Sequence, residues 1–241
     1  MSSDTTAEGR DALLQAVVQS YDHQWFVDHE TTVRRWDEEL AAIIDRGKGI
    51  ARPIDNGVMA IWAVHEVVHE LIELQRSGPV STLYTAVDAW WARQRDLLQM
   101  IVLRSLWEAM IWSGHELTSD WDGVPWVTAD PCKMVLVGNR ELMVSKNKQY
   151  GSSWSVQRSS DMTGMMHAKV HRITQLVSGE ENTFESIEDS YRDIINYALF
   201  CLIRLSMEVT PEQAPRGVPP GSVPGEDAEG RRHRRCCRGD L

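Results

Sequence analysis

Apolar residues recur every three or four positions along most of the chain, which is the spacing of one face of an α-helix. In the first 45 residues this spacing links Leu14, Val18, Tyr21, Trp25, Val33, Trp36, Leu40 and Ile43. Asp4, Thr5 or Thr6 is a candidate cap for the start of such a helix. The pattern therefore predicts that the first 45 residues are helical.

Glycine and proline mark where the predicted helices end. The stretch "DRGKGIARPIDNG" (45–57) ends the first helical region, "SGP" (77–79) the second, and "WDGVPWVTADP" (121–131) reads as a loop. The remaining helices are predicted at about 58–75, 81–112, 133–148, 161–177 and 183–206. No alternating strand pattern of any length is present, so the fold class is all-α: a helical bundle of about six helices.

Composition divides the chain into three parts. Residues 1–127 form an acidic helical region that carries nine of the ten tryptophans, and residues 128–207 form a second helical domain. The tail, residues 208–241, contains "PEQAPRGVPPGSVPGEDAEG", which has too little apolar content to pack, so we expect it to be disordered.

Charge and apolar content exclude several classes of protein. The formal net charge is −10, which disfavours nucleic acid as a partner, because the phosphates would be repelled. The longest apolar run, "IINYALFCLIRL", is shorter than the roughly 20 residues of a membrane span, and "MSSDTTAEGR" does not resemble a signal peptide. The four cysteines form no disulfide framework, so a reduced, cytoplasmic protein is expected.

The motif "HEVVH" matches the zinc-protease pattern, in which His65 and His69 would bind the ion and Glu66 would activate water. A protease also needs a third ligand and an edge strand, and the sequence indicates neither. His65, Glu66, His69, Glu70 and Glu73 share one stripe of an otherwise apolar helix, as on any amphipathic helix. An ordinary solvated face, a metal or polar site and a protease remain alternatives here.

Carboxylates gather on the helix predicted from "FESIEDSYRDIINYALFCL" (184–202). Glu185, Glu188, Asp189, Asp193 and Asn196 share its polar face. Carboxylates so close together repel one another unless water or a cation intervenes, and Mg²⁺ prefers such oxygen ligands together with substrate phosphates. The alternative is a solvated acidic face.

Lysines and aromatic residues meet in "KNKQYGSSW" (146–154). Lys146 and Lys148, with Lys169 and Arg172 of the following helix, are candidate phosphate ligands, and Tyr150 or Trp154 can stack on a base. The alternative is a plain helix end, since Gly151 can adopt the left-handed conformation of a C-terminal cap.

Three motifs in this order, "KNKQYGSSW", "SDMTGMMHAKVHRI" and "EDSYRDIINYA", resemble the nucleotide modification associated domain family of phages and bacteria, over about residues 137–205. That resemblance implies an all-α protein that makes or handles modified deoxynucleotides. Family members read Lys-Asn-x-Asp-Tyr-Gly at the first motif, and Gln149 replaces that acid here.

A weaker resemblance links the chain to MazG-type all-α nucleoside triphosphate pyrophosphatases. It implies that Glu70 and Glu73 stand on a first metal helix, and that Asp189 replaces a ligand position occupied by Ser190. It also implies a homo-oligomer, because such enzymes complete their sites by dimerising.

These observations predict a Mg²⁺-dependent nucleotide-handling protein, a pyrophosphohydrolase of normal or modified nucleoside triphosphates. Catalysis and metal binding would depend on Glu185, Asp189 and Asp193, with Glu188, Glu70 and Glu73 as further metal ligands. The substrate-binding residues would be Lys146, Lys148, Tyr150, Trp154, Lys169, Arg172 and Asn196. The alternative is a non-catalytic module that binds a modified nucleotide or a partner protein.

Overall fold

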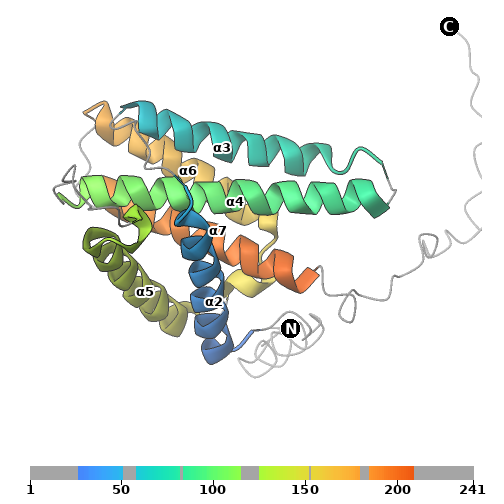
Figure 1. Ribbon diagram of the computed structural model, residues 1–241, viewed down its shortest axis with the longest axis horizontal. Helices are drawn as coiled ribbons and strands as arrows, with labels where there is room; N and C mark the ends of the chain where they lie inside the picture. Colours follow the sequence, from blue (N-terminus) through green and yellow to red (C-terminus); the bar gives the residue numbers. More distant parts are fainter. Residues whose placement is uncertain are drawn as a thin grey trace, which may run out of the picture. The chain divides into compact units, whose positions relative to one another are not determined.

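The computed structural model describes residues 27–50, 58–81, 84–114, 125–151, 153–179 and 185–208. The described residues form helices and no strand, which confirms the all-α prediction (Figure 1). The α-helices are α2 (His29–Gly47), α3 (Val58–Ser77), α4 (Tyr84–Trp112), α5 (Asp130–Tyr150), α6 (Ser159–Val177) and α7 (Ile187–Glu208). Two short 3-10 helices, η2 (Trp126–Thr128) and η3 (Ser153–Val156), precede α5 and α6.

The start of α2 corrects the prediction that the first 45 residues are helical throughout. Asp28 is extended, with φ −67° and ψ 168°, and its carboxylate accepts hydrogen bonds from the backbone N–H and the hydroxyl of Thr31, both at 2.8 Å. An N-cap of this kind begins a helix. Residues 1–26, with the candidate caps Asp4, Thr5 and Thr6, lie outside the described residues.

Two other helix boundaries differ from the predicted ones. Helix α5 begins at Asp130, inside the predicted loop, because Pro131 suits a first helical turn, where a backbone N–H has no partner to lose. At its other end Gly151 has a φ of +63°, which favours glycine, so the helix stops where the sequence predicted. Helix α7 begins at Ile187, and residues 180–184 and the tail from 209 onward are outside the described part.

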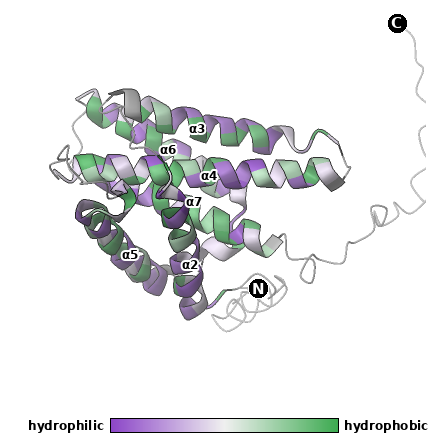
Figure 2. Ribbon diagram, in the orientation of Figure 1, coloured by the Kyte–Doolittle hydropathy of each residue, from purple (hydrophilic) through white to green (hydrophobic). Residues whose placement is uncertain are grey.

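The helices form a core from apolar faces that the sequence pattern already marked. Helix α3 packs along α4 and α6, and α4 packs against α5 (Figure 1). Helix α2 is largely hydrophilic in colour in Figure 2, and it buries Thr32, Trp36, Ile43 and Gly47. Helix α7 is buried through Tyr191, Ile194, Ile195, Ala198, Leu199 and Leu202. None of the described helices combines the length and apolar content that a bilayer span requires.

Hydrogen bonds between buried side chains connect α2 to α5 and α7. The Trp36 indole N–H donates to Oδ1 of Asn196 at 3.2 Å, and the Asn196 amide donates to Oδ1 of Asn139 at 3.1 Å. All three side chains are buried. Losing one partner would leave buried polar groups unpaired, so this connection favours a single arrangement of the three helices.

Candidate functional site

A pocket of about 290 Å³ lies among α5, η3, α6 and α7. Four of the residues predicted from the sequence line it together: Lys146, Trp154, Asp193 and Asn196. The rest of its lining is Met143, Asn147, Gly151, Ser153, Gln157, Met165, Tyr197 and Phe200. The motifs "KNKQYGSSW" and "EDSYRDIINYA", about 40 residues apart in sequence, therefore meet at one hollow.

Two lysines share one carboxylate at this pocket. Lys146 Nζ lies 2.6 Å from Oδ1 of Asp193, and Lys169 Nζ lies 2.8 Å from Oδ2 of the same residue. Lys169 also forms an ion pair with Glu185, whose carboxylate accepts a further hydrogen bond from the Ser190 hydroxyl at 3.2 Å. Asp193 is only 8% exposed, so its charge depends on these lysines for compensation.

The ion pairs set the protonation of the neighbouring groups. Burial would lower the pKa of Lys169, but hydrogen bonds and charge from Asp193 and Glu185 outweigh it and raise that pKa. Burial, and then the charge of Asp193, raises the pKa of Tyr197. Lys169 therefore remains a cation and Tyr197 a neutral hydrogen-bonding group at neutral pH.

One wall of the pocket is aromatic. The rings of Trp154 and Phe200 are stacked with centres 4.9 Å apart and planes 4° from parallel. Trp154 is 5% exposed, so a ligand would contact the edge that faces the pocket rather than a free ring face. The side chain of Tyr150, the other predicted stacking residue, lies outside the described part of the structure.

Amide side chains line the pocket as well, and the sequence analysis identified only one of them. Hydrogen bonds to Trp36 and Asn139 fix the orientation of the Asn196 side chain at the pocket. Asn147 is 5% exposed and forms a 2.7 Å hydrogen bond with His29, while its Oδ1 has no partner among the described residues. Its position inside "KNKQYGSSW", between two candidate phosphate-binding lysines, is the sequence signal that points to Asn147.

Several predicted site residues lie elsewhere. Lys148 is exposed and does not line the pocket, and Arg172 contacts Gln175 at 3.3 Å. Glu188 pairs with Arg192 at 2.5 Å, one helical turn away. Asp189 accepts a 2.8 Å hydrogen bond from the Ser186 hydroxyl at the start of α7.

The acids are not arranged as a ready magnesium site. Glu70 pairs with Arg93 of α4, Glu73 pairs with Arg76 of its own helix α3, and neither lines the α5–α7 pocket. Across the described ranges, no three His, Cys, Asp or Glu side chains stand together in positions that could hold a metal ion. Five of the six predicted metal ligands form an ion pair with a lysine or arginine; Asp189, bonded to Ser186, is the exception.

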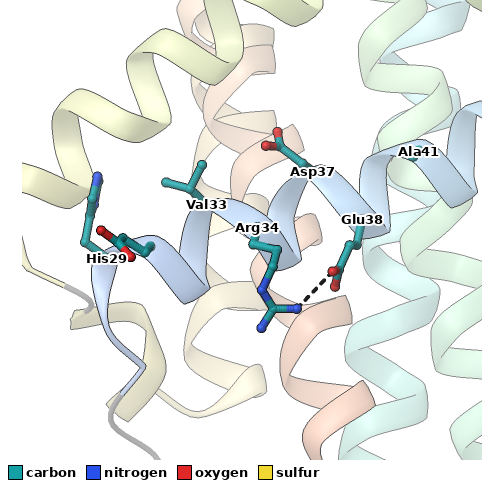
Figure 3. A pocket seen from close by; sticks show the side chains of 7 residues that line it. His29, Val33, Arg34, Asp37, Glu38 and Ala41 are labelled. Atoms are coloured by element: carbon teal, nitrogen blue, oxygen red, sulfur yellow. Dashed lines mark hydrogen bonds and ion pairs between the residues drawn. The ribbon is translucent and has the colours of Figure 1, made fainter.

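A second hollow, of about 590 Å³, lies on α2 and is shown in Figure 3. Its described lining comes from that one helix and includes His29, Val33 and Asp37. Arg34 pairs with Glu38 at 2.9 Å, as Figure 3 shows. The two carboxylate oxygens of Asp37 accept hydrogen bonds from the Arg140 guanidinium at 2.7 and 2.8 Å. None of the predicted site residues lines this hollow, so we do not place the functional site there.

Comparison with known proteins gives one match. Neither the curated proteins nor the solved structures contain a match to this chain. A family model does match, and its span includes every residue that lines the α5–α7 pocket except Met143. The family resemblance drawn from the motifs is thereby confirmed: residues 146–205 match the family described as Nucleotide modification associated domain 1.

Proposed function

We propose that the α5–α7 pocket binds a nucleotide. The observation that carries this proposal is that the family match and the pocket coincide: Lys146 and the stacked rings of Trp154 and Phe200 line the pocket, and Lys169 pairs with the lining residue Asp193. Lysines attract phosphate as point charges, and the edge of the aromatic wall offers an apolar contact to a base. Asn147 and Gln157 add amide groups that can hydrogen-bond to the ligand.

The charges at the pocket indicate how a phosphate group enters. The positive charges of Lys146 and Lys169 are balanced by Asp193 and Glu185. A phosphate therefore competes with these carboxylates for the two lysines. The pocket volume is near the lower end of the roughly 300–1,000 Å³ of small-molecule sites, which suits one nucleoside unit.

Lys146 and Lys148 form a matched pair for testing this proposal, because both lie near the end of α5 and only Lys146 lines the pocket. We expect Lys146→Ala to weaken nucleotide binding about tenfold in calorimetric titrations, and Lys148→Ala to have a smaller effect. Nucleoside binding should be affected by neither substitution, since no phosphate is present. Equal nucleotide affinities for the wild type and Lys146→Ala would contradict the proposal.

A more specific form of the proposal is a Mg²⁺-dependent pyrophosphohydrolase of normal or modified nucleoside triphosphates. It is favoured by the presence of two carboxylates, Asp193 and Glu185, next to the candidate phosphate ligands. It requires both carboxylates to leave their lysine partners. Incubation with Mg²⁺ and a panel of normal and modified deoxynucleoside triphosphates tests it, with released pyrophosphate as the readout.

Binding without pyrophosphate release would identify a non-catalytic nucleotide-binding module. Light scattering on the same samples tests the homo-oligomer expected from the pyrophosphatase resemblance. We place this function in the cytoplasm, where nucleotides are available. The two described cysteines, Cys132 and Cys201, are buried thiols, which suits a reducing compartment.

A further inference from the structure

Four histidines gather where α3 packs against α6, away from the residues that line the nucleotide pocket. His65 and His69 are one turn apart on α3, and their ring centres are 6.3 Å apart. His167 and His171 are one turn apart on α6, and the ring centre of His167 is 5.9 Å from that of His65. Helix α6, about 100 residues further along the chain, thus brings His167 beside the histidine pair of α3.

The imidazoles are free to act as ligands. None of the four forms a hydrogen bond or ion pair with another residue in the described ranges, and His69, His167 and His171 are exposed.

We propose that three of these histidines, His65, His69 and His167, bind a late first-row divalent metal ion such as Zn²⁺. Imidazole nitrogen suits zinc, nickel and copper, and two histidines one helical turn apart can chelate one ion. The motif "HEVVH" lacked a third ligand in the sequence, and α6 supplies one. No strand is described that would hold a peptide, so the site we propose is structural rather than proteolytic.

Binding requires the rings to move closer together. With Zn–N bonds of about 2.0–2.1 Å, two imidazole rings on one tetrahedral ion have centres roughly 5 Å apart. The present separations of 5.9 and 6.3 Å are wider, and no three ligands in the described ranges stand ready for an ion. Exposed side chains change rotamer within nanoseconds, and unlike the acids of the pocket these rings have no ion pair to break.

The test measures zinc binding to the full chain. Cys236 and Cys237 are both changed to Ser in the parent protein, because neighbouring thiols are competing zinc ligands. We expect this parent to bind one Zn²⁺ per chain by titration calorimetry and elemental analysis. Zinc should raise its melting temperature, since the ion links α3 to α6 only in the folded state.

In the same background, His65→Ala and His167→Ala should each weaken zinc binding at least tenfold, while His29→Ala on α2 leaves it unchanged. Circular dichroism and melting in metal-free buffer check that each variant is folded. The inference would be overturned if the parent did not bind zinc. It would also be overturned if His65→Ala and His167→Ala both bound zinc as tightly as the parent. Nucleotide titrations of these variants are read separately, so failure of the metal site is distinguishable from failure of the nucleotide site.

Discussion

Asp193 is the residue on which the two forms of the proposed function differ. Both its carboxylate oxygens are engaged, one by Lys146 and the other by Lys169, and its side chain is nearly buried. If the site binds phosphate through its lysines, Asp193 is an internal competitor for them. If the site binds Mg²⁺, Asp193 is a ligand.

Changing Asp193 to Asn therefore separates the two forms. We expect nucleotide affinity in metal-free buffer to rise several-fold, because the charge that holds both lysines is removed while a hydrogen-bond acceptor is kept. The gain should shrink as salt increases, since screening weakens lysine–phosphate attraction. Calorimetric titrations at low and high salt measure this. A fall in affinity for nucleotide in metal-free buffer would count against the role of Asp193 as a competitor.

Glu108 of α4 predicts a pH dependence of stability. It is 1% exposed, and burial raises the pKa of its carboxyl to about 7 from 4.5, an effect that a contact with Trp112 only partly offsets. Because the pKa of Glu108 is higher in the folded than in the unfolded protein, the folded state favours the neutral carboxylic acid. Its contribution to stability is therefore complete below pH 4.5 and is lost as the pH rises through about 7.

We expect Glu108→Gln to gain stability relative to the wild type as the pH rises from 5 to 8. Over this range the difference between the free energies of unfolding of the two proteins should change by up to roughly 3 kcal/mol. Urea denaturation across this pH range measures the difference curve. Glu141→Gln on the exposed surface of α5 is the control and should follow the wild type. A difference curve independent of pH would mean that Glu108 is charged throughout the range.

At the scale of the element, the start of α7 gives Asp189 a structural contact. Ser186 precedes the helix, its hydroxyl accepts from the backbone N–H of Asp189 at 3.0 Å, and the Asp189 carboxylate accepts from the Ser186 hydroxyl at 2.8 Å. The backbone N–H of Ser186 points to the same carboxylate at 3.4 Å. This reciprocal arrangement is that of a capping box.

Asp189→Ala should accordingly destabilise the metal-free protein by about 1 kcal/mol, because the first turn of α7 loses part of its cap. Thermal melting measures the change, and Asp189→Asn, which keeps an acceptor oxygen, should lose less. A metal ligand in a cluster of repelling acids would behave in the opposite way, since removing it relieves repulsion. An unchanged or raised melting temperature for Asp189→Ala without metal would therefore favour the metal hypothesis.

At the scale of the whole molecule, hydrogen bonds and salt bridges connect helix α2, in the tryptophan-rich region 1–127, to residues of the predicted second domain, 128–207. Trp36 donates to Asn196, Arg140 pairs with Asp37, and Asn147 contacts His29. Helix α4, with Leu97, Leu98, Ile101, Val102 and Leu106 fully buried, also packs against α5. The described helices up to Ser206 belong to one compact unit.

We therefore expect residues 128–207, expressed alone, not to fold stably. Exposing apolar side chains costs about 1.5–3 kcal/mol for each fully buried residue, and a whole domain is stable by only about 5–15 kcal/mol. Circular dichroism melting of the fragment, with the full chain as the control, measures this. A cooperative transition in the fragment would show that it is an independent domain, as the composition of the chain predicted.

The fold class and most of the helices could be predicted from the sequence, because helix periodicity and glycine or proline breaks are local signals. The turn at Gly151 and the buried stripe of α7 are of this kind. The start of α2 was mispredicted because apolar spacing continued through Asp28, whose cap depends on the local contact with Thr31. The family resemblance was also readable, since it depends on the order of motifs.

What the sequence alone could not determine is which charges face each other. Lys146, Lys169, Glu185 and Asp193 were each identified as candidates, but their ion pairs depend on how α5, α6 and α7 pack. The same packing brings His167 of α6 to the "HEVVH" motif of α3, and leaves Lys148 outside the pocket. Local spacing selects the face of a helix on which a residue lies, whereas only the packing of the helices decides what that face meets.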